Sequence, residues 1–203
     1  MREPRRAAAE VGVRRRRARH RAGIEPGLSD LEVAAAQQRF GLSFPPDLRA
    51  LLQHGLPTGR DLPNWRDPDA DDYLRWALGK SGRAIEFDVL NNGVWFGRWG
   101  PRPETDARSA ALAADEFRKV PVLVPVYANH YLPGDPPAAG NPVLSFWQII
   151  DAVYRANDLA DYLAAEFDAP RPAWTTPTDR RRTVPFWSAV IESSGSLHEL
   201  ADV

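Results

Sequence analysis

The stretch FDVLNNGVWFGRWGPRP, residues 87–103, places three glycines among tryptophans and charged residues, so it could serve a glycine-dependent chemistry. A glycine loop that binds phosphate needs free backbone N–H groups leading into a helix, with a lysine or serine at a fixed offset. Here bulky residues fill the G-x-x-x-G-x-x-G spacing, and Gly100 runs into Pro101 and Pro103, which offer no N–H. The sequence therefore argues against a phosphate loop.

A β-hairpin explains the same stretch better, and its register can be argued. A two-residue turn at Asn92 and Gly93 would place Glu86 opposite Trp99 and mix acids with tryptophans on one face. A three-residue loop over 91–93 would place Glu86 opposite Arg98 instead. One face would then carry Ile85, Phe87, Val89, Trp95, Gly97 and Trp99. Because burial favours the cleaner face, we expect the three-residue loop, with Phe96 and Arg98 facing outward.

Carboxylates and histidines are the other groups that could carry catalysis. Glu86 and Asp88 lie two residues apart on one face of the expected strand, and a solvated face with Arg98 across from it explains them more simply than a catalytic pair. The four histidines, His20, His54, His130 and His198, have no metal-ligand spacing, and no G-x-S-x-G motif is present. The chain also has no cysteine. We expect a protein that is not an enzyme and holds neither metal nor cofactor.

Charge is divided unevenly along the 203 residues. The net charge is −1, but nine arginines and two acids give residues 1–22 a charge of +7, which leaves −8 for residues 23–203. The basic segment could attract nucleic acid or anionic lipid, but we favour a disordered extension, because no aromatic residue lies among its charges. The acidic remainder repels nucleic acid and favours cationic partners. No apolar run approaches ~18 residues, so we expect a cytoplasmic protein without a membrane span.

Hydrophobic periodicity predicts one α+β domain over residues 23–195, whose central mixed or antiparallel sheet is flanked by helices, followed by a tail at 196–203. Ser29 and Glu32 have capping-box spacing at the start of a helix that Gly41 ends. Further helices are expected over residues 43–54, 70–80, 104–119, 149–167 (one or two helices, with a cap at Asn157) and 184–193. Strands are expected over residues 120–128 and 141–148. On the helix at 70–80 we expect Tyr73, Leu74, Trp76 and Leu78 to be buried.

With the hairpin in place, the order of several blocks resembles the SUKH superfamily, which includes yeast cell-wall assembly regulators and bacterial immunity proteins. The blocks are FPPDLRALLQHGLPTG, LPNWRDP, FDVLNNGVWFGRWGPRP, VPVYANHYLPGDPPAAGNPVLSF, NDLADYL and VPFWS. They extend from about Leu28 to Ser188. The resemblance implies an α+β domain that binds proteins, and many bacterial members neutralise secreted toxins, often nucleases. An acidic body suits a basic nuclease-type partner, since complementary charge accelerates association.

Partner-binding residues are expected among aromatic and arginine side chains that folding leaves partly exposed. Trp95, Trp99 and Trp187 are expected in the core instead. The candidates lie in the irregular loop before residue 70, on the outward face of the hairpin and at the start of the proline-rich loop. They are Trp65, Arg66, Phe96, Arg98, Tyr127, His130 and Tyr131.

Three functions stay open on the sequence alone. The first is toxin immunity or a related protein-binding role. The second is a general interaction or ligand-sensing module of the same fold. The third is a nucleic-acid-associated protein that acts through the arginine-rich residues 1–22.

Overall fold

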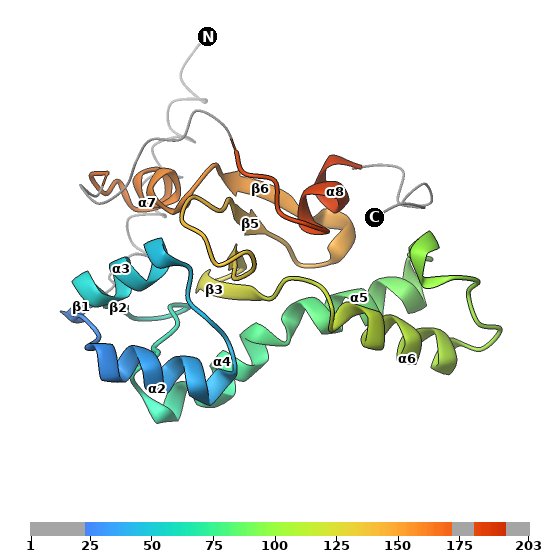
Figure 1. The fold of residues 1–203 in the computed structure, drawn as a ribbon, viewed down its shortest axis with the longest axis horizontal. Helices are drawn as coiled ribbons and strands as arrows, with labels where there is room; N and C mark the ends of the chain where they lie inside the picture. Colours follow the sequence, from blue (N-terminus) through green and yellow to red (C-terminus); the bar gives the residue numbers. More distant parts are fainter. Residues whose placement is uncertain (1–22, 172–180, 194–203) are drawn as a thin grey trace, which may run out of the picture.

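The computed structural model describes residues 23–171 and 181–193, and it shows an α+β fold with two antiparallel sheets (Figure 1). The arginine-rich segment 1–22, His20, His198 and the tail at 196–203 lie outside the described residues. The helices are α2 (Asp30–Phe40), α3 (Pro46–His54), α4 (Asp71–Leu78), α5 (Lys80–Asn91), α6 (Asp106–Phe117), α7 (Leu159–Phe167) and α8 (Trp187–Glu192). Short 3-10 helices are η1 (Pro68–Ala70), η2 (Gly97–Trp99) and η3 (Ile149–Asp151). The strands are β1 (Gly23–Pro26), β2 (Gly55–Thr58), β3 (Leu123–Tyr127), β4 (His130–Pro133), β5 (Val143–Ser145) and β6 (Val153–Ala156).

The first helix begins and ends as its sequence predicts. The Ser29 hydroxyl accepts a bond from the Glu32 N–H at 3.3 Å, and Glu32 Oε2 accepts one from the Ser29 N–H at 2.8 Å, which completes the capping box. Gly41 then ends α2 in the left-handed conformation, at φ 64°. The predicted helices at α3, α4, α6, α7 and α8 are confirmed as well, as are the strands β3 and β5.

A four-stranded sheet in the order β3-β4-β5-β6 divides the interior into two cores. Successive residues of a strand point to opposite faces, and here Tyr131 and Leu132 on β4 go to different cores, as do Val143 and Leu144 on β5. One core lies among α2, α3, α4 and α7. The other lies among α5, α6, α8 and the residues around η2 and η3.

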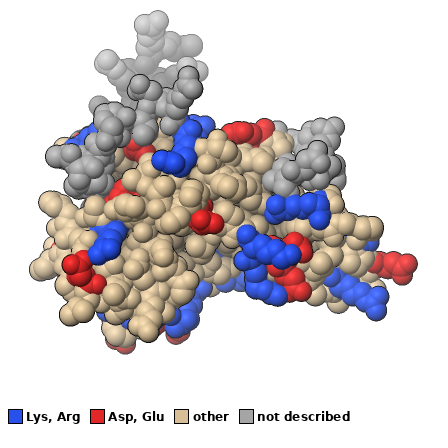
Figure 2. Space-filling model, viewed as in Figure 1, with Lys and Arg blue, Asp and Glu red and all other residues tan. Residues whose placement is uncertain are grey.

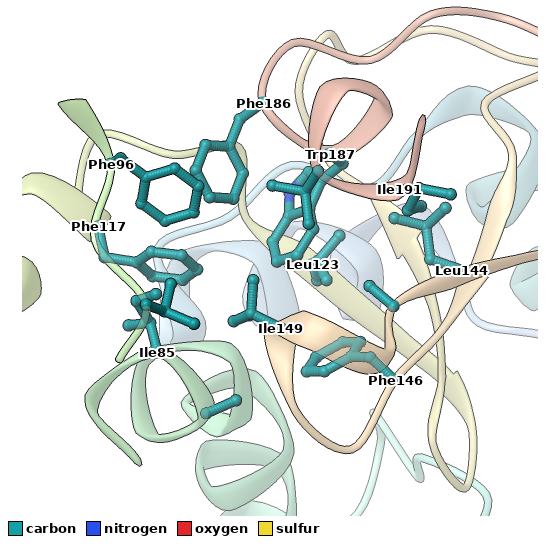
Figure 3. Packing of buried hydrophobic residues seen from close by; sticks show 14 of the residues in the cluster. Ile85, Phe96, Phe117, Leu123, Leu144, Phe146, Ile149, Phe186, Trp187 and Ile191 are labelled. Carbon is teal, nitrogen blue, oxygen red and sulfur yellow. The ribbon is translucent and has the colours of Figure 1, made fainter. Parts of the chain in front are cut away.

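Trp187 of α8 is fully buried at the centre of the second core (Figure 3). Phe117 and Phe186 meet it edge to face, at ring-centroid distances of 6.0 and 5.2 Å, and Phe146 stacks on it at 5.9 Å. Its indole N–H donates to the Pro121 carbonyl at 2.8 Å, so the only polar atom of the side chain is satisfied. The predicted core position of Trp187 is confirmed.

The predicted hairpin around residues 91–93 is wrong, because residues 80–91 form α5. Ile85 and Val89 are buried four residues apart, the spacing of one helix face, although the alternation of Ile85, Phe87 and Val89 is equally typical of a strand. Gly93, at φ 69°, lies just past the helix end rather than in a hairpin loop. Glu86 and Asp88 therefore do not share a strand face, and neither pairs with Arg98.

Trp95 and Trp99 nevertheless pack together, through η2 rather than through a strand. Their rings meet edge to face at 5.2 Å, and the Trp95 indole N–H donates to the Gly100 carbonyl at 2.8 Å. Trp99 is buried and Trp95 is partly buried against the second core.

Three further expectations need correction. The stretch expected to be a loop after Tyr127 is strand β4, reached by a turn at Ala128 and Asn129. The start of the helical region expected from residue 149 is η3 followed by strand β6, and α7 is capped by Asp158, whose Oδ1 accepts from the Asp161 N–H at 2.7 Å, not by Asn157. Trp76, expected to be buried, is half exposed.

Candidate partner-binding surface

Four of the aromatic residues expected at the surface are buried: Trp65, Phe96, Tyr127 and Tyr131. Trp65 lies between Phe40 and Phe44, with ring-centroid distances of 5.6 and 4.9 Å. Phe96 and Tyr131 are fully buried in the second core. The expectation that folding leaves these four side chains partly exposed is wrong, because each one fills a core position that the sheet or a neighbouring helix provides.

Arg66 is half-buried and ties the loop before η1 to strand β1. Its guanidinium pairs with Glu32 at 2.6 Å and with Glu25 at 3.2 Å, and it donates to the carbonyl oxygens of Pro26 and Gly27. The hydrogen bonds from Arg66 and Ser29 lower the pKa of Glu32 to about 2. These contacts make Arg66 a structural clamp in the free chain.

Tyr127 and His130 are brought together at the β3–β4 turn, on the side of the sheet that faces α7. Tyr127 is buried, and His130 is half-buried with its Nδ1 2.7 Å from the Tyr162 hydroxyl. Burial lowers the pKa of His130 to about 4, so the ring is neutral at physiological pH. Arg98 is the one exposed residue of the expected set, and its guanidinium lies 5.3 Å from the centre of the Phe186 ring.

A different surface exposes large apolar side chains. Trp76 is 50% exposed, Phe87 46% and Trp147 65%, and Leu90 and Ile150 are also exposed. Together with Arg83, these residues are called the aromatic surface below. Tryptophan and arginine are among the residues most enriched at the energetic centres of protein interfaces.

Two nearly continuous helices present one half of the aromatic surface. Only Gly79 separates α4 from α5, and helical bonds continue across it: the Gly79 N–H donates to the Arg75 carbonyl at 3.0 Å, and the Arg83 N–H to the Gly79 carbonyl at 3.2 Å. Figure 1 shows the two helices following one another along the lower edge of the molecule. Asp72, Trp76, Arg83, Phe87 and Leu90 are therefore spaced by 4, 7, 4 and 3 residues, which keeps them on one stripe.

The other half comes from the segment around η3, which is fixed to α5 at two points. Lys80 Nζ donates to the Phe146 carbonyl at 3.0 Å and lies 3.9 Å from the centre of the Trp147 ring. About two turns further along the same side of α5, Asp88 Oδ2 accepts from the backbone N–H groups of Ile149 and Ile150, at 2.6 and 3.3 Å. Asp88 is fully buried, and burial raises its pKa.

Cations one turn apart on α5 thus hold the two exposed tryptophans. Arg83 lies 5.3 Å from the centre of the Trp76 ring and donates to the Trp76 carbonyl, while Lys80 holds Trp147. Such contacts restrict the indoles without covering them, so less side-chain entropy is lost when a partner binds.

Acidic residues lie beside the aromatic surface at the start of α4. Asp69 and Asp72 are exposed, and no ion pair to either is found within the residues that the structure describes. They precede Trp76 by seven and four residues. On the face that Figure 2 shows, by contrast, charged groups are scattered and neither sign forms a continuous patch.

A shallow open groove of about 550 Å³ lies elsewhere on the described part of the chain. It lies between the end of α2 and the residues around β3 and β4, and its lining includes Gln37, Gln38, Leu42, Val122 and Asp135. Asp135 is the only ionisable residue in the lining, so the groove offers little to fix the orientation of a ligand.

Sequence reasoning missed Trp76, for which a helical pattern was available, and Trp147, for which none was. On α4 the buried residues Leu74 and Ala77 define the inward face, and Trp76 projects about 200° away from Leu74. Trp147 lies two residues after Ser145, the last paired residue of β5. Beyond the end of a strand, the alternation of side chains no longer predicts which of them are buried.

Within the described residues, no group of three His, Asp or Glu side chains could hold a metal ion, and no helix is both long and apolar enough to cross a membrane. A scan against protein-family models found no match, and neither curated proteins nor solved structures gave one. The likeness to the SUKH superfamily therefore depends on the sequence blocks alone.

Proposed function

We propose that this chain is a protein-binding domain that neutralises a secreted toxin, in the manner of SUKH immunity proteins. The observation that carries the proposal is the aromatic surface, where Trp76, Phe87 and Trp147 are about half exposed, whereas the other aromatic side chains that the structure describes lie in the cores or pack against them. A free protein gains nothing in stability from exposed tryptophans, whereas a partner that covers them gains buried apolar area.

Charge supports a cationic partner. Residues 23–203 carry a net charge of −8, and Asp69 and Asp72 lie beside Trp76 without an ion pair in the described part of the chain. A nuclease that binds a polyanionic substrate is itself basic, so its substrate-binding face would be attracted to these carboxylates. Occupation of that face would block the substrate.

The test is co-expression of the full chain with a secreted toxin encoded by a neighbouring gene. We expect wild-type protein to restore growth and to bind the purified toxin with an affinity that falls as salt rises. Combined Trp76→Ala and Trp147→Ala substitutions should weaken binding at least a hundredfold, because each removes a central aromatic contact.

Leu31→Ala is the matched control, since Leu31 is 83% exposed but lies on α2, away from the aromatic surface. It should bind as wild type does. If the double variant binds and protects normally, the aromatic surface is not the interface; if wild-type protein neither binds nor protects against any neighbouring toxin, the immunity function is wrong.

A further inference from the structure

Lys80 is the only lysine of this chain that is buried, and it is one of two lysines among 26 basic residues. Lys80 as a whole residue is 6% exposed. The side chain of Lys119 is 69% exposed and pairs with Glu116 at 2.7 Å. Arginine stays charged in proteins, while a buried lysine can lose its proton. The buried basic residue is therefore a lysine, the basic side chain that can become a neutral amine.

Aromatic rings surround the amine. Nζ lies 3.9 Å from the centre of the Trp147 ring, 5.3 Å from that of Phe146 and 5.7 Å from that of Tyr131. No carboxylate of the described residues comes within ion-pair distance of it, and its one hydrogen bond goes to the Phe146 carbonyl at 3.0 Å. An ammonium has three N–H groups, so two of them have no hydrogen-bond acceptor among the described residues, and the rings are their nearest contacts.

Neighbouring charges act on Lys80 from two elements. Asp151 on η3 favours the ammonium, while Arg83 on α5 opposes it, and burial has the largest effect. The net result lowers the pKa of Lys80 to about 8, so a useful fraction of the amine is neutral near physiological pH. A neutral amine in an apolar setting is the form in which lysine acts as a nucleophile.

The hydrogen-bonding groups of the residues around Lys80 match those of an acylated lysine. An acylated lysine has a single N–H, and the existing bond to the Phe146 carbonyl satisfies it. The new acyl oxygen needs a donor, and the hydroxyl of the fully buried Tyr131 finds no hydrogen-bond partner within the described residues. A neutral amide among three rings avoids the cost of the buried charge.

We propose that Lys80 is a covalent modification site for small activated acyl donors, with Tyr131 as the residue that positions the acyl carbonyl and Trp147 as its outer cover. In the reaction with an acyl phosphate, neutral Nζ attacks the carbonyl carbon and the N–C bond forms. The C–O bond to phosphate breaks, phosphate leaves with the bonding electrons, and the amine proton passes to it or to water. The modification removes the positive charge that lies under the Trp147 indole.

The experiment uses acetyl phosphate on the full chain between pH 6.5 and 9.5, with the acetylated fractions of Lys80 and Lys119 followed by peptide mass spectrometry. At pH 7 a pKa of about 8 raises the neutral fraction roughly 200-fold over an ordinary lysine, and the lower intrinsic nucleophilicity of a less basic amine reduces the advantage to about tenfold. We expect Lys80 to react about tenfold faster than Lys119 at pH 7, with a rate that levels off above pH 8.

Tyr131→Phe keeps the ring and removes the hydroxyl, so it should slow acetylation of Lys80 several-fold and leave Lys119 unchanged. Lys119→Arg serves as the control for the assignment of the labelled peptide. The proposal is overturned if Lys119 reacts as fast as Lys80 across the pH range, or if Tyr131→Phe leaves the Lys80 rate unchanged while circular dichroism shows a folded protein.

Discussion

The aromatic residues of the second core and those of the aromatic surface are the same residue types in opposite settings. Phe96, Phe117, Phe186 and Trp187 are linked by ring contacts at centroid distances of 5.2 to 6.0 Å, and all four are buried. Trp76 lies against Arg83 and stacks on Tyr73 at 6.2 Å, Trp147 lies against Lys80, and both indoles remain half exposed or more. The difference indicates that the first group stabilises the fold and that the second is available to a partner.

The largest effect is expected in the core. Trp187→Ala removes the ring at the centre of the second core and leaves the Pro121 carbonyl without its donor, so it should lower the free energy of unfolding by about 3–5 kcal/mol. Urea denaturation measures this change. A loss below about 1 kcal/mol would mean that the two aromatic groups do not differ as proposed.

Asp88 links the second core to the aromatic surface, because its hydrogen bonds hold α5 against the segment that carries Trp147. Asp88→Ala leaves the buried N–H of Ile149 without an acceptor and should cost about 1–3 kcal/mol of unfolding free energy. It should also weaken partner binding through loss of the Trp147 position. Asp88→Asn keeps one acceptor oxygen and should cost less; equal losses in both variants would argue against the backbone contact as the cause.

The pH dependence of stability tests the environment of Lys80. Its pKa is about 8 in the folded chain and about 10.4 in the unfolded chain, so between these values the unfolded state binds more protons. Stability from this group therefore rises with pH over that range, by about 1–3 kcal/mol. The difference in unfolding free energy between wild type and Lys80→Met, measured from pH 7 to 10.5, should grow in favour of wild type; a flat difference would place Lys80 in water.

The smallest change in stability is expected at the aromatic surface. Trp147→Ala and Trp76→Ala should each alter the unfolding free energy by less than about 1 kcal/mol, since both indoles are largely hydrated. The main effect of these two substitutions is expected on the affinity for the partner. If urea denaturation shows a loss of unfolding free energy as large as that of Trp187→Ala, the core and surface aromatic residues do not differ in their contribution to stability.

Local signals predicted much of this fold. Ser29, Glu32 and Gly41 define the limits of α2 because caps act through neighbouring residues, and the continuous apolar run of β3 reflects burial on both faces. The helix at 80–91 was misread because Ile85, Phe87 and Val89 satisfy a period of two as well as part of a period of 3.6. Tertiary contacts decide such a case: buried Lys80, Ala84 and Asp88 lie on the inward side of α5.

The candidate site was less accessible to sequence reasoning. Exposure of a tryptophan depends on which neighbours cover it, and those neighbours come from distant segments. Phe40 and Phe44 cover the Trp65 ring. Among the described residues, the ring contact of Trp147 is with Lys80. The sequence therefore names aromatic and arginine side chains as candidates, but it does not indicate which of them folding leaves exposed.

The place of α8 has a consequence for the synthesis of the chain. Trp187, Val190 and Ile191 complete a core whose other members begin at Ala84, more than a hundred residues earlier. The α2–α3–β2 part can bury its apolar residues sooner, but the second core stays open to water and to chaperones until residues 184–191 have left the ribosome. Substitutions in α8 should therefore reduce the yield of native protein in cells, even where the purified variant is stable.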